Sequence, residues 1–424
     1  MKNPLKIGIL GLGTVGSGVV KSLEGNDLVS IKKVAVRNIN KKRSVNLPVD
    51  VLTEDSFSVV NDKDIDVVVE LIGGTNPAYE LVKTAIENKK HIVSANKELI
   101  ATYGKELFEL AKKNNVIILY EAAVAGGIPI IMPIKTSLCG NKVTKVAGIL
   151  NGTTNYILTK MTDEGADFAE TLKQAQELGY AEADPTADVE GFDAAYKISI
   201  LASIVFNQRI DVKKVYREGI SKITSTDIQY ADELGYKIKL IAKAELLDGG
   251  SVDIRVHPML VSKKQMISRI DDVLNAVMVE GFPVGQVIFS GPGAGEFPTA
   301  SSVIGDVLCL AQEMEAGDKN PLAMMQCKHE TAADILDIKN SHNKYYINLT
   351  AENVPGVIGK LGEICGKNNI NFVSILQKGI LENDTARVII LTSMALEADI
   401  QKAVEEMTNS SIIKDITNVI RVMD

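Results

Sequence analysis

The sequence has few of the residues that hold disulfide-rich or metal-dependent folds together. Four cysteines occur in 424 residues and no two form a CxxC pair; they are Cys139, Cys309, Cys327 and Cys365. This scatter argues against a disulfide framework and against a zinc site of the usual spacing. The four histidines form no pattern either. We therefore expect a protein of the reduced cytoplasm.

Long apolar runs and an excess of positive charge are also absent. No apolar run approaches the roughly 20 residues that a membrane-spanning helix needs. Residues 1–6 lead directly into a strand-like segment, so we expect no secretory leader. The formal net charge is −8, and the densest basic run is confined to residues 41–43. These features argue against nucleic-acid and membrane partners.

The N-terminal third alternates short apolar segments with amphipathic ones. The spacing predicts buried strands at residues 5–10, 31–36, 66–72, 91–94 and 116–120, with helices near 77–88 and 104–113. Continuous apolar strands alternating with helices predict a parallel sheet covered on both faces. Residues 1–130 are thus predicted to form an α/β Rossmann dinucleotide-binding domain, to which residues 300–320 return.

Three further regions follow along the chain. Residues 131–299 mix strand-like and helical segments and predict an α+β substrate and dimerisation domain. Residues 321–343 are mainly polar and predict a linker. Residues 344–424 predict the element order βαββαβ, which is the ferredoxin-like unit. With such domains we expect a homodimer or homotetramer.

A glycine-rich turn follows the first predicted strand. It reads Gly11-Leu-Gly13-Thr14-Val15-Gly16 and precedes a predicted helix, which is the context that GxGxxG needs for dinucleotide binding. The first glycine permits the tight turn, the second lets the backbone approach the pyrophosphate, and the third lets helix pack on strand. The helix N-terminus would then face the phosphates. The alternative is an ordinary strand-to-helix turn.

The second predicted strand ends on a cation rather than an acid. An acid there accepts from the ribose 2′-hydroxyl of NAD, whereas Arg37 suits the 2′-phosphate of NADP. We therefore predict NADP preference, or use of both cofactors. The alternative is an arginine that only faces solvent.

Three segments place polar residues in apolar surroundings. Lys97 follows a predicted strand, where open α/β sheets bind ligands. Glu121 precedes small residues whose carbonyls can converge on a hard cation. Asp193 and Lys197 lie four residues apart at the start of an apolar helix. The alternatives are a solvated lysine, a tight bend, and a surface ion pair worth about 0.3–0.5 kcal/mol.

Together these segments resemble the homoserine dehydrogenase family. The family signature is an alanine, three residues and a glycine, then Asp-Pro, a further Asp, Gly-x-Asp and a final Lys, and it runs from Ala175 to Lys197. Asn151–Asn155 and Gly291–Gly295 are similar to further motifs of the family. The resemblance covers residues 5–320.

The resemblance implies reversible reduction of aspartate 4-semialdehyde to homoserine with NADP or NAD, in the biosynthesis of threonine, methionine and isoleucine. It implies Lys197 as the acid/base, a role that typically contributes about 10²–10⁴-fold. Lys97 and Asp193 would assist the catalysis. Substrate is assigned to Glu182, Asp188 and Thr153, and cofactor also to Gly295. A structural Na⁺ is assigned to Glu121 and the carbonyls of Val124, Gly126 and Ile128.

Residues 345–424 resemble an ACT domain. The turn Asn353-Val-Pro355-Gly356 is close to the usual Asp-x-Pro-Gly loop, with Asn353 in place of the acid. The resemblance implies binding of an amino acid near Asn353 and Gly356, and threonine as feedback effector. The alternative is a dimerisation module without a ligand.

Two other functions are compatible with parts of the sequence. One is another Rossmann oxidoreductase acting on a semialdehyde, but aspartate semialdehyde dehydrogenase needs a catalytic Cys and His, and Cys139 has no evident histidine partner. The other is a non-catalytic NAD(P) and amino-acid sensor, against which Lys97, Glu182, Asp193 and Lys197 argue. The chain has no room for the aspartate kinase domain fused in some family members, so we expect a monofunctional enzyme.

Overall fold

The computed structural model describes residues 4–315, 323–327, 329, 331–381 and 384–423. The chain divides into two compact units, each described here by itself. Unit 1 comprises residues 1–150, 195–215 and 274–333, and unit 2 comprises 151–194, 216–273 and 334–424. Residues 316–320 of the predicted return and 321, 322, 328 and 330 of the predicted linker lie outside the described residues. The predicted domain boundaries stay a prediction.

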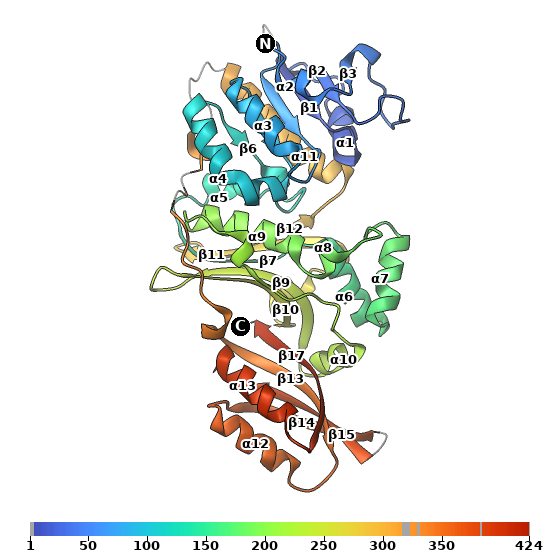
Figure 1. The fold of residues 1–424 in the computed structure, drawn as a ribbon, viewed down its shortest axis with the longest axis vertical. Helices are drawn as coiled ribbons and strands as arrows, with labels where there is room; N and C mark the ends of the chain where they lie inside the picture. Colours follow the sequence, from blue (N-terminus) through green and yellow to red (C-terminus); the bar gives the residue numbers. More distant parts are fainter. Residues whose placement is uncertain (1–3, 316–322, 328, 330, 382–383, 424) are drawn as a thin grey trace. The chain divides into compact units, whose positions relative to one another are not determined.

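Unit 1 contains a six-stranded, wholly parallel sheet in the order β3-β2-β1-β4-β5-β6 (Figure 1). Its strands are β1 (Leu5–Leu10), β2 (Val29–Ala35), β3 (Leu52–Thr53), β4 (Val67–Glu70), β5 (His91–Ser94) and β6 (Ile118–Leu119). The strand order reverses between β1 and β4, which is the switch point where such sheets bind ligands. The predicted Rossmann fold is therefore confirmed.

The helices of this sheet are α1 (Thr14–Ser22), α2 (Ser56–Val60), α3 (Ala78–Glu87), α4 (Lys97–Asn114) and α11 (Glu296–Glu315). The prediction of residues 104–113 was too short for α4, because the Asn96 side chain accepts from Leu99 N–H and caps a helix that begins at Lys97. Helix α11 contacts α1 closely: a Cβ on Gly18 would lie 2.5 Å from the Glu296 carbonyl oxygen.

The rest of unit 1 adds η2 (Glu121–Ala123), α5 (Ile131–Lys135) and an antiparallel group ordered β12-β11-β7. Its strands are β7 (Lys142–Ile149), β11 (Leu274–Phe282) and β12 (Gly285–Pro292). Helix α9 (Phe192–Val205) begins in unit 2 and continues into unit 1.

Unit 2 contains a sheet in the order β9-β10-β17-β13-β15-β14. Strands β9 (Tyr236–Leu246) and β10 (Val252–Ser262) form an antiparallel pair, and helices α6 (Gly152–Glu164), α7 (Phe168–Glu177), α8 (Thr186–Val189) and α10 (Ser225–Glu233) belong to the same unit. Strand β10 also pairs in parallel with β17, through Met259–Val261 and Arg421–Met423. The C-terminal strands therefore continue the sheet of β9 and β10.

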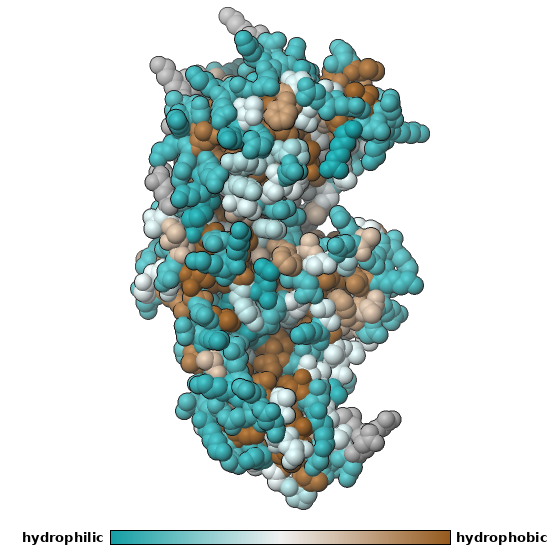
Figure 2. Space-filling model, in the orientation of Figure 1, coloured by the Kyte–Doolittle hydropathy of each residue, from teal (hydrophilic) through white to brown (hydrophobic). Residues whose placement is uncertain are grey.

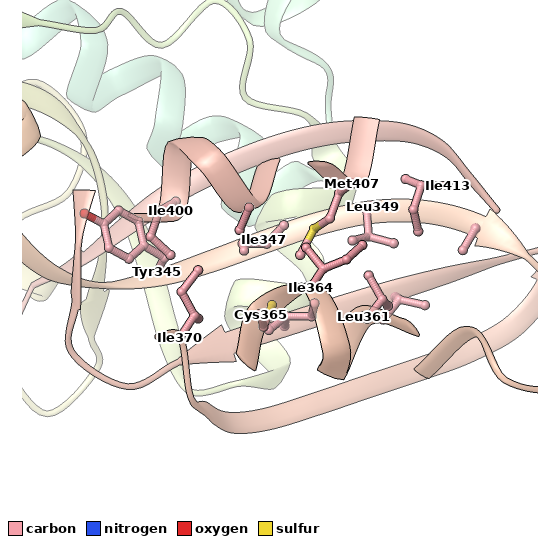
Figure 3. Close-up of a cluster of buried hydrophobic side chains, with 14 of the residues drawn as sticks. Tyr345, Ile347, Leu349, Leu361, Ile364, Cys365, Ile370, Ile400, Met407 and Ile413 are labelled. Atoms are coloured by element: carbon pink, nitrogen blue, oxygen red, sulfur yellow. The ribbon is translucent and has the colours of Figure 1, made fainter. Parts of the chain in front are cut away.

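The C-terminal elements confirm the predicted βαββαβ order. They are β13 (His342–Glu352), α12 (Val357–Lys367), β14 (Phe372–Leu381), β15 (Thr385–Thr392), α13 (Glu397–Thr408) and β17 (Ile413–Met423). Figure 3 shows apolar side chains of α12 and α13 pointing toward those of β13, where Ile347 and Leu349 are fully buried. This core holds both helices on the sheet.

Among the described residues, no helix is long and apolar enough to cross a membrane. Hydrophilic residues cover most of the face drawn in Figure 2, and hydrophobic residues appear there in scattered groups.

Candidate active site

The glycine turn lies between β1 and α1 as predicted. Gly11 has a φ of 102°, which only glycine adopts readily. A Cβ on Gly16 would overlap the Gly11 carbonyl oxygen, whereas a Cβ on Gly13 would meet nothing within 4 Å. Thr14 and Val15 form the first residues of α1, whose N-terminus carries no side-chain cap. The turn therefore offers open backbone and unpaired helix N–H groups to an anion.

A cavity of about 370 Å³ adjoins this turn. Its walls include Gly11–Gly13, Leu71, Ile72, Arg37, Lys41, Arg43 and Glu54. The Arg43 guanidinium donates to the carbonyls of Asn38, Ile39 and Lys41 and so shapes the loop after β2. Glu54 accepts from the Ile39 N–H. Three cations and one acid thus line the place where a ribose 2′ substituent is read.

Lys97 is half-buried and begins α4 directly after β5. The adjacent Asn96 and Ser94 both donate hydrogen bonds to Glu70, a fully buried carboxylate at the end of β4. Burial raises the pKa of Glu70 in spite of these bonds. The structure thus places Lys97 at the carboxyl edge of the sheet, beside a polar network that the sequence analysis did not include.

Glu121 is buried, and its carboxylate accepts hydrogen bonds from the backbone at the start of α5. Its carboxylate accepts from Ile130 N–H at 2.5 Å, Ile131 N–H at 2.7 Å and Met132 N–H at 2.6 Å, which caps α5. Its own N–H donates to Asp306 Oδ2 at 2.9 Å. Burial raises the pKa of both Glu121 and Asp306, and the charge of Glu121 adds to the shift at Asp306.

The turn after Glu121 has unusual backbone torsions, which set the directions of its carbonyl groups. Ala125 and Gly126 have φ values of 58° and 56°. The Gly126 carbonyl accepts from the Ser302 hydroxyl at 2.6 Å. One buried carboxylate beside several carbonyls is a donor set suited to a hard cation. Among the described residues, no group of three or more His, Cys, Asp or Glu side chains is placed to hold a metal.

In unit 2, Asn151 connects two of the predicted substrate residues. Its Nδ2 donates to Asp188 Oδ1 at 2.6 Å and to Asp193 Oδ2 at 2.9 Å, while its Oδ1 caps α6 by accepting from Thr154 N–H. Asp193 is 5% exposed. The structure therefore brings Asp188 and Asp193 together around an amide that the sequence analysis quoted only as part of a motif.

The other predicted substrate residues are less tightly held. The Thr153 hydroxyl donates to the Tyr180 carbonyl at 2.6 Å and is buried. Glu182 is exposed on the loop between α7 and α8.

Lys197 occupies the buried side of α9, one turn after Asp193. Its side chain is 9% exposed, and Nζ donates to the Leu150 carbonyl at 2.7 Å. A solvent-exposed ion pair would leave this lysine in water, so the surface alternative does not describe it. The bond to a backbone oxygen fixes where the ammonium lies.

Three predicted residues lie in other places. Gly295 has a φ of 127° immediately before α11 in unit 1. In unit 2, Gly356 has a φ of 95° and precedes α12, and Asn353 N–H donates to the Asp384 carbonyl at 3.0 Å. The turn that contains Asn353 and Gly356 is thus a left-handed turn at a helix N-terminus.

Sequence reasoning missed Glu70, Asp306 and Asn151. An acid ending a strand of valines is a signal that was present for Glu70. Asp306 lies inside an amphipathic helix, where nothing local distinguishes it from a surface acid.

Comparisons with known proteins match three segments of this chain to family models. Residues 129–308 match the family model described as homoserine dehydrogenase, and residues 11–121 match its NAD-binding domain. Residues 345–409 match the ACT domain.

Relatives match over the whole chain. A homoserine dehydrogenase of Synechocystis is 46% identical over 99% of both chains. The crystal structure of one from Thiobacillus denitrificans is 39% identical, covers 100% of this chain and 99% of that chain, and has a TM-score of 0.93. A hyperthermophilic archaeal homoserine dehydrogenase in complex with NADPH is 25% identical and covers 72% of this chain and 97% of that chain, with a TM-score of 0.60. The chain belongs to the homoserine dehydrogenase family.

Proposed function

We propose that this enzyme reduces aspartate 4-semialdehyde reversibly to homoserine, with Lys197 as the proton donor. The bound nicotinamide supplies the hydride to the carbonyl carbon, and the carbonyl oxygen then takes one proton. The single observation that carries the proposal is the buried Lys197 ammonium, held at 2.7 Å by the Leu150 carbonyl. A proton donor fixed in this way can act on a bound substrate without rearranging.

The carboxylates of unit 2 are proposed to bind the amino-acid end of the substrate. Glu182 is exposed and carries the charge that an ammonium group seeks. Asp188 and Asp193 are held by Asn151 and would line the same pocket, with Thr153 as a further contact. Lys97 would contact the substrate or nicotinamide from the carboxyl edge of the sheet.

Replacing Lys197 tests the proton donor. Lys197→Ala should lower kcat by several decades, and on the order of 10²–10⁴-fold is assigned to proton transfer. Lys197→Arg is the matched variant, because it keeps the positive charge and the donor but does not release a proton near neutral pH. Both variants should bind NADPH normally. Turnover retained in Lys197→Arg would assign Lys197 an electrostatic role only.

We propose NADP as the preferred cofactor. Arg37, Lys41 and Arg43 line the cavity at the end of β2, and the archaeal relative was solved with NADPH. Arg37→Ala should raise the KM for NADPH far more than the KM for NADH. Lys63→Ala, outside this cavity, provides a charge-matched control. Equal effects of Arg37→Ala on both cofactors would contradict the proposal.

We also propose that Glu121 and the carbonyls of Val124, Gly126 and Ile128 hold a structural Na⁺. The residues fit, because a cation there would compensate two buried carboxylates, Glu121 and Asp306. The melting temperature should rise with NaCl relative to equal choline chloride. Equal melting temperatures in the two salts would count against the site.

The ACT domain is proposed to bind threonine at the turn of Asn353 and Gly356, where α12 presents its N-terminus. Millimolar L-threonine should raise the melting temperature and inhibit the enzyme, with D-threonine as control. An unchanged melting temperature and activity would favour a ligand-free dimerisation module.

We propose a cytoplasmic homodimer or homotetramer. Its free cysteines suit a reducing compartment, and the β11–β12 turn exposes Phe282 by 80%. Light scattering after size exclusion distinguishes dimer, tetramer and monomer, and a monomer would contradict the proposal.

A further inference from the structure

We propose that Glu70 is a positioning residue that holds two loops in register, one lining the dinucleotide cavity and the other carrying Lys97. Glu70 ends β4 at the point where the sheet order reverses, and its side chain is 0% exposed. Its carboxylate accepts hydrogen bonds from both loops.

The first loop is the segment 71–74 that follows β4. Glu70 Oε1 accepts from Ile72 N–H at 3.0 Å and from Gly73 N–H at 3.3 Å. Gly73 and Gly74 have φ values of 70° and 66°, so the backbone turns back toward the carboxylate. Leu71 and Ile72 form part of the wall of the dinucleotide cavity.

This loop also lies directly on the glycine turn. A Cβ on Gly11 would be 3.0 Å from the Leu71 carbonyl oxygen and 3.2 Å from Ile72 Cγ2. The loop therefore packs closely on the glycine turn, and releasing it from Glu70 should alter the wall of the cavity. Cofactor affinity should depend on Glu70 for this reason.

The second loop is the segment 94–97 that follows β5. The Ser94 hydroxyl donates to Glu70 Oε2 at 2.7 Å, and Asn96 Nδ2 donates to Oε1 at 3.3 Å. Asn96 Nδ2 also donates to the Gly74 carbonyl at 2.6 Å, which joins the two loops directly. Because Asn96 Oδ1 caps α4, the same amide sets the helix start at which Lys97 lies.

In each of these four hydrogen bonds, Glu70 is the acceptor. The two backbone N–H groups and the Asn96 amide can only donate, and the Ser94 oxygen already accepts from Asn96 N–H at 3.1 Å. The two carboxylate oxygens accept all four of these bonds at once. In Glu70→Gln, an NH2 group takes the place of Oε2 and faces Ser94, so the Ser94 hydroxyl loses its acceptor. The second loop should then loosen.

A purely structural role predicts a different result. A buried group that only stabilises the domain lowers the melting temperature and leaves the kinetics of the folded enzyme unchanged. Lys90 provides the matched control, because it is 4% exposed, immediately precedes β5 and donates to the Ile65 carbonyl at 2.8 Å. Lys90 thus makes its contacts at the N-terminal ends of β4 and β5, whereas Glu70 lies at their C-terminal ends.

The experiment compares Glu70→Gln, Ser94→Ala, their double mutant and Lys90→Met in the full-length enzyme. NADPH affinity is measured by nicotinamide fluorescence, and kcat by homoserine oxidation. Glu70→Gln should weaken NADPH binding by about 3–10-fold and lower kcat by roughly 10–100-fold, since small misplacements are costly. The fold loss in the double mutant should be smaller than the product of the two single-mutant fold losses, because both changes break the same hydrogen bond between Ser94 and Glu70. Lys90→Met should lower only the melting temperature.

Glu70→Gln with normal kcat and normal NADPH affinity would overturn the proposal and leave Glu70 a stabilising residue. The kcat part rests on the role proposed for Lys97, whereas the affinity part does not. If Lys97→Ala keeps full turnover while Glu70→Gln still binds NADPH weakly, the role of Lys97 fails and the loop-holding role of Glu70 stands.

Discussion

Two glycines of the dinucleotide turn should respond in opposite ways to the same added methyl group. A Cβ on Gly16 would lie within 3.0 Å of the Gly11 carbonyl oxygen, a separation that real Cβ contacts essentially never show. A Cβ on Gly13 would meet nothing within 4 Å, and its φ of −87° suits alanine. Gly16→Ala therefore damages the fold, whereas Gly13→Ala fills space that the cofactor needs.

The expected magnitudes follow from this geometry. The Gly16 overlap involves backbone on both sides, so the turn has to shift, which costs about 1–3 kcal/mol as overpacking does. At about 2–4 °C per kcal/mol for a domain of this size, the melting temperature should fall by roughly 2–12 °C. Gly13→Ala should change it by about 2 °C at most, because a reduced unfolded-state entropy offsets a poorer helix cap.

NADPH binding should be weakened more by Gly13→Ala than by Gly16→Ala. In Gly13→Ala the methyl group projects from the segment that approaches the pyrophosphate, so NADPH affinity should fall at least about tenfold, or ~1.4 kcal/mol. The assay is thermal unfolding without ligand, followed by fluorescence titration with NADPH at a temperature where both variants are folded. A Gly16→Ala enzyme that melts like the wild type, or a Gly13→Ala enzyme that melts lower but binds normally, would refute these assigned roles.

Three further predictions concern other parts of the molecule. Burial above all, together with the nearby cations Arg209 and Lys135, lowers the pKa of His329 to about 3. Unfolding exposes a histidine that binds a proton below about pH 6.5, so this contribution to stability is complete above that pH and falls as the pH drops, by about 2 kcal/mol at pH 5. Urea unfolding at pH 8 and pH 5 should show this loss in the wild type and not in His329→Gln. Asn151→Ala removes the donors that hold Asp188 and Asp193, the carboxylates proposed to line the substrate pocket, and should lower kcat/KM for homoserine about 10–100-fold with unchanged NADPH affinity. An unchanged kcat/KM would contradict this role. Tyr346→Phe leaves Asp227 with one donor fewer and should cost about 1 kcal/mol in urea unfolding, without a change in kcat.

Several features of this protein were readable in the sequence because they are local. The glycine turn needs only six consecutive residues, and the strand and helix that flank it show their own periodicity. The βαββαβ order of residues 344–424 follows from alternating apolar patterns of ordinary length. The Ala175–Lys197 signature carries the chemistry in one continuous segment, so the family was predictable before any contact was known.

Local sequence patterns predict helix boundaries less well where polar groups, rather than apolar residues, define the start of the helix. The predicted helix began at residue 104, whereas α4 begins at Lys97, where the Asn96 side chain supplies the cap. Helix α11 likewise mixes polar and apolar residues along its length, and its buried face begins at Thr299. Capping bonds and mixed faces weaken the hydrophobic signal on which such predictions depend.

The tertiary structure alone decided which distant groups meet. Glu121 N–H bonds Asp306 across 185 residues, and Asn151 reaches Asp193 across 42. Strand β17 joins the sheet of β10, which ties the ACT domain to the substrate domain. Side-chain partners far apart in sequence leave no trace in local periodicity, because their pairing depends on how the strands order themselves in the sheet. The sequence by itself therefore determined the family and its chemistry, whereas the fold determined which carboxylates are buried, what holds them, and which residues position Lys97 and Lys197.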